Sequence, residues 1–570
     1  MTPRRERASA VSGATRRSRV HARLLTSSPA PIPDLLCADA RVRVDVSALR
    51  QALVFAFAAG GLDDAIEQAI ENAELPDSSW QKDAFERDVY LAELVDGCFG
   101  VRIAGKRLRT CARYVTRVLA APPRDAADVE TRRAVLAELA ASAEAREELE
   151  TACLAVVRLR ALLCAARQPA PRVRRMEILR AAREAFDLLA SSFETATSGL
   201  ARLRAFGAAV VRGEGYRRLA MLLESDEHQG SLDLRVRVGA DGEVRSMLIV
   251  GVHENRANPF HVSPVRRFFA RLMLMLRGYR TTEGEVAERL LSDVFGGLEE
   301  HVAMLVQLQG DIHVYLGALG FRDFALEKGL VVALPTLAPS NGALELEGLF
   351  NPLLLGSTGA PIPCDLKVGA GATVVVTGPN SGGKTRLLQA VAITQLLSQA
   401  GMFAPARVAR IPRASGLFAS LFEEARADQP EGHLGMELLR IRRLFQDLDA
   451  DALVVLDELC SGTNPSEGEE IARLVLSLLP ELGVRAFVTT HLLKFAAGLA
   501  SDLPGASLEF LQVELDSREW PTYRFVPGVA RTSLAQKTAE RLGVTRGELL
   551  QLIAGKAAKR TGAAGAKNGA

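Results

Sequence analysis

Residues 377–386 read TGPNSGGKTR and directly follow the apolar run Val374–Val376. The stretch from Gly378 to Thr385 matches the P-loop pattern GxxxxGK[ST], and it lies between an expected buried strand and an expected helix. Glycines let backbone N–H groups converge on phosphate oxygens, and the first turn of the helix adds partial positive charge. The stretch therefore predicts a phosphate-binding loop in an α/β domain, rather than a glycine-rich turn that binds nothing.

Within this loop, Lys384 is expected to reach the β- and γ-phosphates of a nucleotide, and Thr385 to ligate Mg²⁺. The remaining loop positions contribute backbone N–H groups or lie beside the phosphates. The residues expected to contact the nucleotide are Gly378, Pro379, Asn380, Ser381, Gly382, Gly383, Lys384, Thr385 and Arg386.

Two later strands end in polar residues that suit the same chemistry. LVVL at 453–456 is followed by Asp457, a candidate Mg²⁺ ligand, and by Glu458, a candidate for orienting the attacking water. RAFVTTH at 485–491 ends in His491, which is expected at the same sheet edge, where it could sense the γ-phosphate. The alternatives are a solvated strand end for the acids and a structural role for the histidine.

Strands and helices alternate around these motifs. TVVVT at 373–377, ALVVLDE at 452–458 and RAFVTTH at 485–491 alternate with expected helices at 384–399 and 466–479. This order predicts a parallel, doubly wound α/β domain. The second helix has a clear start, with Asn464 as N-cap and Pro465 in the first turn.

The chain as a whole divides into four regions. We expect a disordered basic arm at 1–40, a mostly helical region at 41–330 with a β-hairpin inserted at 231–252, the α/β domain at 331–545, and a basic disordered tail at 546–570.

Composition limits the class of protein. The chain has 570 residues, 48% of them hydrophobic, and its net charge of +2 identifies no partner. The seven cysteines are scattered without CxxC pairs, which predicts reduced thiols in the cytoplasm and neither a disulfide framework nor a zinc site. No apolar stretch approaches the roughly 18–20 residues of a membrane helix, so no membrane partner is expected.

Five motifs together resemble one family. Their order is that of the ATPase domain of the MutS family of DNA mismatch-repair proteins, and the resemblance spans about 340 to 545. The motifs are GPNSGGKTR (378–386), QAGMFAPA (399–406), VVLDELCSGTNPSEG (454–468), VTTH (488–491) and YRFVPGVARTSLAQKTAERLG (523–543). The GTNPSEG turn resembles the second bacterial MutS subgroup, whose members lack mismatch-reading domains.

This resemblance implies an ABC-type ATPase that uses ATP and Mg²⁺ and acts as a homodimer. Long helical levers would close around duplex or branched DNA without sequence specificity, in repair or recombination, with other repair proteins as possible partners. We expect no mismatch discrimination, because only about 40 residues precede the helical region. In the family, mismatch reading needs a Phe-x-Glu motif on a separate N-terminal domain. The one Phe-x-Glu of this chain, at 422–424, lies inside the ATPase domain instead.

One motif departs from the family. Where the family has a Ser-Thr-Phe signature that supplies a hydroxyl to the γ-phosphate of the other subunit, this chain reads EGHLGMEL at 431–438. Gly432 and His433 thus replace the Ser and Thr. A backbone N–H at a helix start could still meet phosphate, so we expect binding with slow hydrolysis.

Nucleic-acid contact rests on two arginine-rich stretches that could grip phosphates. Lys106, Arg109, Arg113 and Arg117 have helical spacing, and Arg266, Arg267, Arg271, Arg277 and Arg280 surround aromatic residues. Solvated charged faces are the alternative for each. Two other functions stay open: an ATPase that acts on ribosomes or structured RNA, and an interaction module that uses nucleotide as a switch with little hydrolysis.

Overall fold

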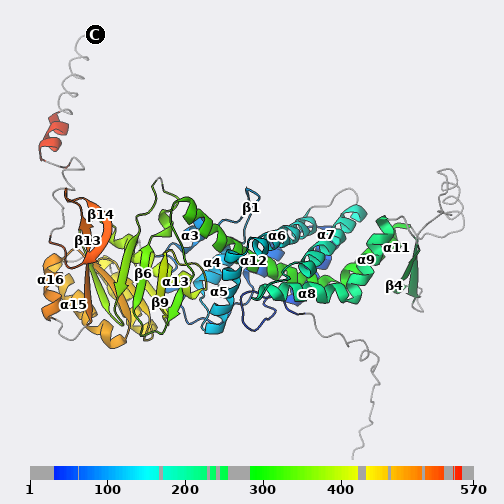
Figure 1. Cartoon of the computed structure of the whole chain (residues 1–570), viewed down its shortest axis with the longest axis horizontal. Helices are drawn as coiled ribbons and strands as arrows, with labels where there is room; N and C mark the ends of the chain where they lie inside the picture. Colours follow the sequence, from blue (N-terminus) through cyan, green and yellow to red (C-terminus); the bar gives the residue numbers. More distant parts are fainter. Residues whose placement is uncertain are drawn as a thin grey trace, which may run out of the picture.

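The computed structural model describes residues 31–61, 63–165, 171–227, 231–238, 244–253, 283–357, 359–421, 432–459, 464–502, 507–531, 544 and 546–554. The molecule is elongated (Figure 1). The P-loop sheet lies at one end, helices fill the middle, and strand β4 lies at the opposite end.

Helices dominate the described part of 46–327 because apolar residues recur at helical spacing. In α6, for example, Leu149, Cys153, Val156, Leu159 and Leu163 form one buried stripe. The helices are α1 (Val46–Ala59), α2 (Asp63–Glu71), α3 (Leu91–Cys98), α4 (Ala112–Ala120), α5 (Ala126–Ala141), α6 (Ala143–Cys164), α7 (Pro171–Ser191), α8 (Leu200–Arg212), α9 (Glu214–Glu227), α11 (Glu283–Gly296) and α12 (Glu299–Glu327).

Helix α12 forms the axis of this region. It packs against α1, α2, α3, α4, α5 and α6, and nearly every residue from Val302 to Phe321 is buried. By length and composition it could cross a membrane, contrary to the expectation that no apolar stretch is long enough. However, 94% of its most apolar 18 residues are buried inside the protein, as in the core helix of a globular domain.

An antiparallel strand pair extends from the helices. β3 (Ser231–Val238) pairs with β4 (Val244–His253), with Ser231 opposite His253 and Val238 opposite Val244. Leu234 and Ile249 pack against the helical core, which anchors the pair. The arginines at 266–280 lie outside the described residues.

The expectation of a disordered arm over 1–40 is wrong for residues 31–40. Leu35 and Leu36 are fully buried, and the hydroxyl of Tyr315 on α12 donates to the carbonyl of Leu35 at 2.6 Å. Asp34 forms a buried ion pair with Arg43 at 3.2 Å. The segment is extended, so its few apolar residues carry no helical or strand periodicity by which the sequence could reveal their burial.

The P-loop strand belongs to a six-stranded sheet in the order β10-β11-β12-β8-β13-β14. The strands are β8 (Thr373–Thr377), β10 (Leu417–Ser420), β11 (Leu453–Leu456), β12 (Arg485–Thr490), β13 (Leu508–Leu515) and β14 (Pro521–Pro527). All neighbours are parallel except β13 and β14. The prediction of a parallel sheet is confirmed, with one antiparallel edge strand that it did not include.

Both faces of this sheet are covered, as its near-continuous apolar strands require. Val374 and Val376 pack on one face with α13 (Lys384–Gln399), whereas Val375 packs on the other. That second face is covered by α14 (Gly432–Asp447), α15 (Pro465–Leu482) and α16 (Leu493–Asp502). The expected N-cap of α15 is confirmed, because the Asn464 side chain accepts a hydrogen bond from the Ser466 N–H.

A second, four-stranded sheet was not predicted. Its order is β5-β9-β6-β7, with β5 (Thr336–Ala338), β6 (Leu344–Leu349), β7 (Cys364–Val368) and β9 (Val408–Pro412). β6 is antiparallel to both of its neighbours, so no βαβ pattern announces it in the sequence.

Helix α13 lies between the P-loop sheet and the helical region. Every residue from Leu387 to Gln399 is buried, including three glutamines whose amides are all satisfied. Gln389 donates to the carbonyl of Asp88, Gln395 to that of Pro412 and Gln399 to that of Ala414. The P-loop helix is therefore in direct contact with the helical region.

The tail also differs from the expectation, because residues 546–554 are helical. Leu549, Leu550, Leu552 and Ile553 are all exposed on this helix.

Candidate active site

The loop after β8 has a backbone that only glycine adopts easily. Gly378 has φ 144° and Gly383 has φ 88°, and Gly383 precedes the first residue of α13. A Cβ atom at Gly378 would lie 2.6 Å from Cγ2 of Val513, which is closer than real contacts allow. The glycines of the motif thus serve both the turn and the close packing of the loop on β13.

Lys384 begins α13 and folds back over this loop. Its Nζ donates to the carbonyl oxygens of Gly378 and Pro379 at 3.2 Å each and lies 3.7 Å from Oε1 of Glu458. Burial lowers the pKa of Lys384, and the nearby Glu458 and Asp457 carboxylates oppose that shift. The ammonium group is held where the phosphates of a P-loop nucleotide would lie.

Thr385 and Asp457 meet although 72 residues separate them. The threonine Oγ1 donates to Oδ2 of Asp457 at 2.5 Å. A hydroxyl and a carboxylate are oxygen ligands suited to Mg²⁺, which usually takes few protein ligands and completes its shell with water and phosphate oxygens. These residues fit a nucleotide-bound Mg²⁺, and among the described residues no group of three or more His, Cys, Asp and Glu forms a separate metal site.

Glu458 and His491 lie beside this pair. Nδ1 of His491 is 3.6 Å from Oε2 of Glu458, so the histidine contacts this carboxylate at the edge of the sheet. Glu458 has φ 47°, a left-handed conformation that is uncommon outside glycine.

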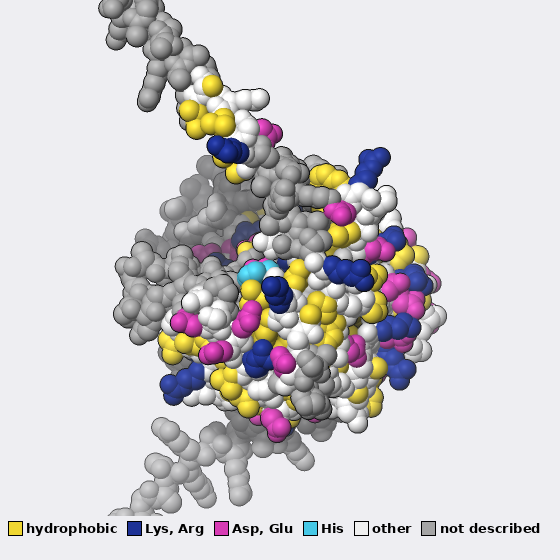
Figure 2. Space-filling model, turned by 90° about the vertical axis from the view of Figure 1, so that its left-hand side faces the viewer, with side chains coloured by type: hydrophobic (Ala, Val, Ile, Leu, Met, Phe, Trp, Pro, Cys, Tyr) yellow, Lys and Arg dark blue, Asp and Glu magenta, His cyan; other side chains and the backbone are white. Residues whose placement is uncertain are grey.

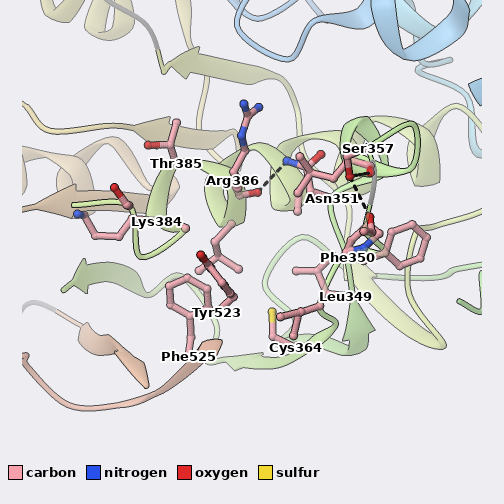
Figure 3. Close-up of a pocket in the computed structure, with 18 of the residues that line it drawn as sticks. Leu349, Phe350, Asn351, Ser357, Cys364, Lys384, Thr385, Arg386, Tyr523 and Phe525 are labelled. Atoms are coloured by element: carbon pink, nitrogen blue, oxygen red, sulfur yellow. Dashed lines mark hydrogen bonds between the residues drawn. The ribbon is translucent and has the colours of Figure 1, made fainter. Parts of the chain in front are cut away.

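A cavity of about 900 Å³ extends from the loop. In Figure 3, Lys384 and Thr385 lie at one end of it and Phe350 and Ser357 at the other. The sequence did not predict this second end. Its lining residues are Leu349, Phe350, Asn351, Leu354, Ser357, Gly359, Ala360, Pro361, Ile362 and Cys364. Tyr523 and Phe525 line the wall nearer the loop, where a Cβ atom at Gly383 would lie 3.3 Å from the Tyr523 ring (Figure 3). The apolar side chains suit the flat face of a nucleobase.

The structure brings most of the expected site residues to this cavity. Asn380, Ser381, Gly383, Lys384, Thr385, Arg386, Asp457 and Glu458 line it. Gly378 and Gly382 pack against Val513, and His491 contacts the cavity residue Glu458 without lining the cavity itself.

The site connects to the helical region through Asp88. One carboxylate oxygen of Asp88 accepts the N–H of Leu421 at 2.7 Å, and the other pairs with Arg440 on α14 at 3.0 Å. Because Gln389 of α13 also bonds Asp88, a single residue of the helical region contacts both the P-loop helix and α14. Helix α14 begins at Gly432, where the altered signature stands.

The expectation that Lys106, Arg109, Arg113 and Arg117 share one helical face is wrong. Lys106 lies on strand β2 (Lys106–Arg107), and Arg109 precedes α4, so the four residues do not share one helix. Arg109 pairs with Glu67 at 3.1 Å and Arg113 with Glu71 at 3.6 Å. Acidic partners on α2 thus neutralise these arginines.

Part of the chain is similar to known proteins. The family model described as MutS domain V matches residues 374–546. The Endonuclease MutS2 of Thermomicrobium roseum is 37% identical over 206 residues, which is 35% of this chain and 25% of the relative. Residues 374–546 of this chain form a MutS domain V.

Two further relatives named Endonuclease MutS2 extend the match. The one from Thermus thermophilus is 31% identical over 276 residues, 47% of this chain and 35% of the relative. The one from Streptococcus gordonii is 29% identical over 301 residues, 52% of this chain and 37% of the relative. The chain thus spans between a quarter and somewhat over a third of the length of these MutS2 proteins.

Proposed function

We propose that this protein is a Mg²⁺-dependent ATPase of the MutS type that couples ATP binding and hydrolysis to dimer closure on DNA. The observation that carries the proposal is the convergence of Lys384, Thr385, Asp457 and Glu458 on one cavity with an apolar end. The membership of residues 374–546 in MutS domain V supports it.

Each residue has a role in this proposal. Lys384 exchanges its loop carbonyls for phosphate oxygens, and Thr385 and Asp457 hold Mg²⁺, which neutralises phosphate charge when bound. Glu458 orients the attacking water, and His491 holds the Glu458 carboxylate and senses the γ-phosphate. The loop from Gly378 to Arg386 would enclose the phosphates with the backbone N–H groups of its non-proline residues.

Hydrolysis is tested with purified protein at concentrations that favour dimers, by measuring phosphate release with ATP and Mg²⁺. Release that requires Mg²⁺ and depends on Lys384 supports an ATPase. Tight nucleotide binding with no release in a single turnover favours the switch-like module instead, for which the altered signature at the start of α14 is the specific observation.

The proposed DNA-binding surface includes the β3–β4 pair, at the end of the molecule opposite the P-loop sheet (Figure 1). Arg235 and Arg237 are both exposed on β3 and alternate with Leu234, which packs on the core. By contrast, Figure 2 shows basic and acidic side chains interspersed over the P-loop end, so that face concentrates no positive charge. The division into a helical region at 41–330 and an ATPase domain at 331–545, the homodimer and the cytoplasmic location belong to the same proposal.

The DNA proposal is tested by the salt dependence of binding to duplex, junction, single-stranded DNA and structured RNA. Replacing both Arg235 and Arg237 with Gln should weaken duplex binding and reduce the slope of log K against log salt by about 1.8, since each phosphate contact contributes about 0.9. The matched control replaces Arg109 and Arg113 with Gln, and it should leave the slope unchanged because acidic partners hold both arginines. Preference for RNA over every DNA would favour the ribosome or structured-RNA function.

We also expect no preference for a G·T mismatch over the matched duplex. Contacts to phosphate and shape respond to salt and geometry more than to one base pair. A tenfold preference in competition at one salt concentration, about 1.4 kcal/mol, would contradict this expectation.

A further inference from the structure

Thr489 is a residue of the site that touches neither the cavity nor, in the proposed mechanism, the nucleotide. It is the fifth residue of β12 and is fully buried. Its Oγ1 donates to Oδ1 of Asp457 at 2.5 Å and accepts the backbone N–H of Glu458 at 2.8 Å. A hydroxyl has one proton and two lone pairs, so it makes both bonds at once.

These two bonds act on the two acidic residues of the site in different ways. Oδ2 of Asp457 is held by Thr385, so the bond from Thr489 to Oδ1 fixes the second carboxylate oxygen and the plane of the group. Glu458 adopts φ 47°, a strained conformation that a non-glycine residue keeps only where its surroundings hold it. The bond from the Glu458 N–H to Thr489 is the contact that holds this residue's backbone.

The neighbouring threonine does not share this role. Oγ1 of Thr490 accepts the N–H of Leu492, at the turn that follows β12. Successive side chains of a strand point to opposite faces of the sheet, so the Thr489 and Thr490 hydroxyls lie on different faces.

We propose that Thr489 is a positioning residue of the ATPase site: its hydroxyl sets the orientation of the Mg²⁺-binding Asp457 and the backbone of the water-orienting Glu458. This inference rests on the proposed function. The new element is that one side chain on the adjacent strand holds both the Asp457 carboxylate and the Glu458 backbone.

The test compares Thr489→Val, which keeps the shape and removes the hydroxyl, with Thr489→Ser, which keeps the hydroxyl. The matched control is Thr394→Val, because Thr394 is equally buried and its hydroxyl donates only to the Ala390 carbonyl within α13. Two quantities are measured: the Mg²⁺ concentration for half-maximal binding of a fluorescent, non-hydrolysable ATP analogue, and kcat and KM for ATP.

Removal of a group that orients a metal ligand typically costs 10–100-fold in metal affinity or activity. We expect Thr489→Val to raise the Mg²⁺ midpoint at least tenfold and to lower kcat at least tenfold, with KM for ATP changed less than about threefold. Thr489→Ser should recover most of both losses, and Thr394→Val should match the wild type.

Two results would overturn the proposal. One is an unchanged Mg²⁺ midpoint and kcat in Thr489→Val. The other is a Thr489→Ser variant as impaired as Thr489→Val, which would show that the hydroxyl is not the cause. If Thr489→Val does not fold, Thr489→Ala replaces it in the same comparison with Thr489→Ser.

The binding measurement separates this inference from the proposed function. If the wild-type protein binds the analogue with Mg²⁺ but hydrolyses no ATP, the ATPase proposal fails, and the Mg²⁺ midpoint still decides the role of Thr489. If the wild type binds no nucleotide, both fail together.

Discussion

Replacing Lys384 with Ala should abolish the stabilisation that nucleotide gives the protein while leaving the protein itself folded. Without nucleotide, the lysine donates to two loop carbonyls that border a cavity large enough for water to replace it. Because water can bond both carbonyls in the variant, the net change in the free energy of unfolding should be only about 1 kcal/mol, comparable to one ordinary hydrogen bond.

The effect on binding is much larger. An ammonium shared between two phosphates makes charge-assisted hydrogen bonds of about 1.5–3 kcal/mol each. The net loss of even one such bond, about 2.7 kcal/mol, weakens binding about 100-fold. At a concentration 100 times the wild-type Kd, nucleotide stabilises the wild type by about 2.7 kcal/mol and the variant by only about 0.4 kcal/mol. For a long chain each kcal/mol raises Tm by about 2 °C, so the expected shifts are about 5 °C and about 1 °C.

The assay is thermal denaturation with and without a non-hydrolysable ATP analogue and Mg²⁺. Lys367→Ala is the matched control, because Lys367 is an exposed lysine that pairs only with Glu345 at 2.6 Å. It should keep the full shift. If Lys384→Ala also keeps it and hydrolyses ATP normally, the assignment of the P-loop is wrong. If Lys384→Ala is several kcal/mol less stable without nucleotide, the lysine is structural.

Three other outcomes are expected. Glu458→Gln should keep ATP binding, slow hydrolysis by orders of magnitude and trap a nucleotide-bound dimer, as measured by single-turnover phosphate release and by sedimentation; normal turnover would assign the water to another group. Gly432→Ser, which restores the hydroxyl of the family signature, should raise the hydrolysis rate at dimer-forming concentrations, and no rise would mean that the signature lies elsewhere. Arg43→Met should lower the free energy of unfolding by about 3–5 kcal/mol in urea, because it leaves the fully buried Asp34 and Asp311 without their cation. The exposed ion pair of Arg50 with Glu299 serves as control, since Arg50→Met should cost less than about 1 kcal/mol.

Local signals in the sequence were sufficient for the centre of the site. The P-loop, the strand before it and the helix after it are contiguous, so residues 373–399 carry their own periodicity and glycine pattern. Asp457 was also predictable, because the carboxyl ends of parallel strands meet at one edge of a sheet.

The rest of the site depends on contacts between distant segments. The second end of the cavity comes from the β6–β7 connection at 349–364, which has no repeating apolar pattern. The wall nearer the loop includes Tyr523 and Phe525 from an edge strand. The sequence predicted Thr489 only as a residue near the end of a strand and assigned it no role. Nothing in the sequence showed that its hydroxyl, rather than that of Thr490, faces Asp457.

The burial of residues 387–399 of α13 limits how the P-loop domain can be studied in isolation. A fragment that starts near residue 331 would expose the side of α13 whose Gln389 bonds Asp88, and it would remove the Trp80 side chain that donates to the Ala414 carbonyl. Such a fragment would present a large apolar surface to solvent and would aggregate rather than report the activity of the native site. Kinetic measurements therefore require the helical region and the P-loop domain in one polypeptide.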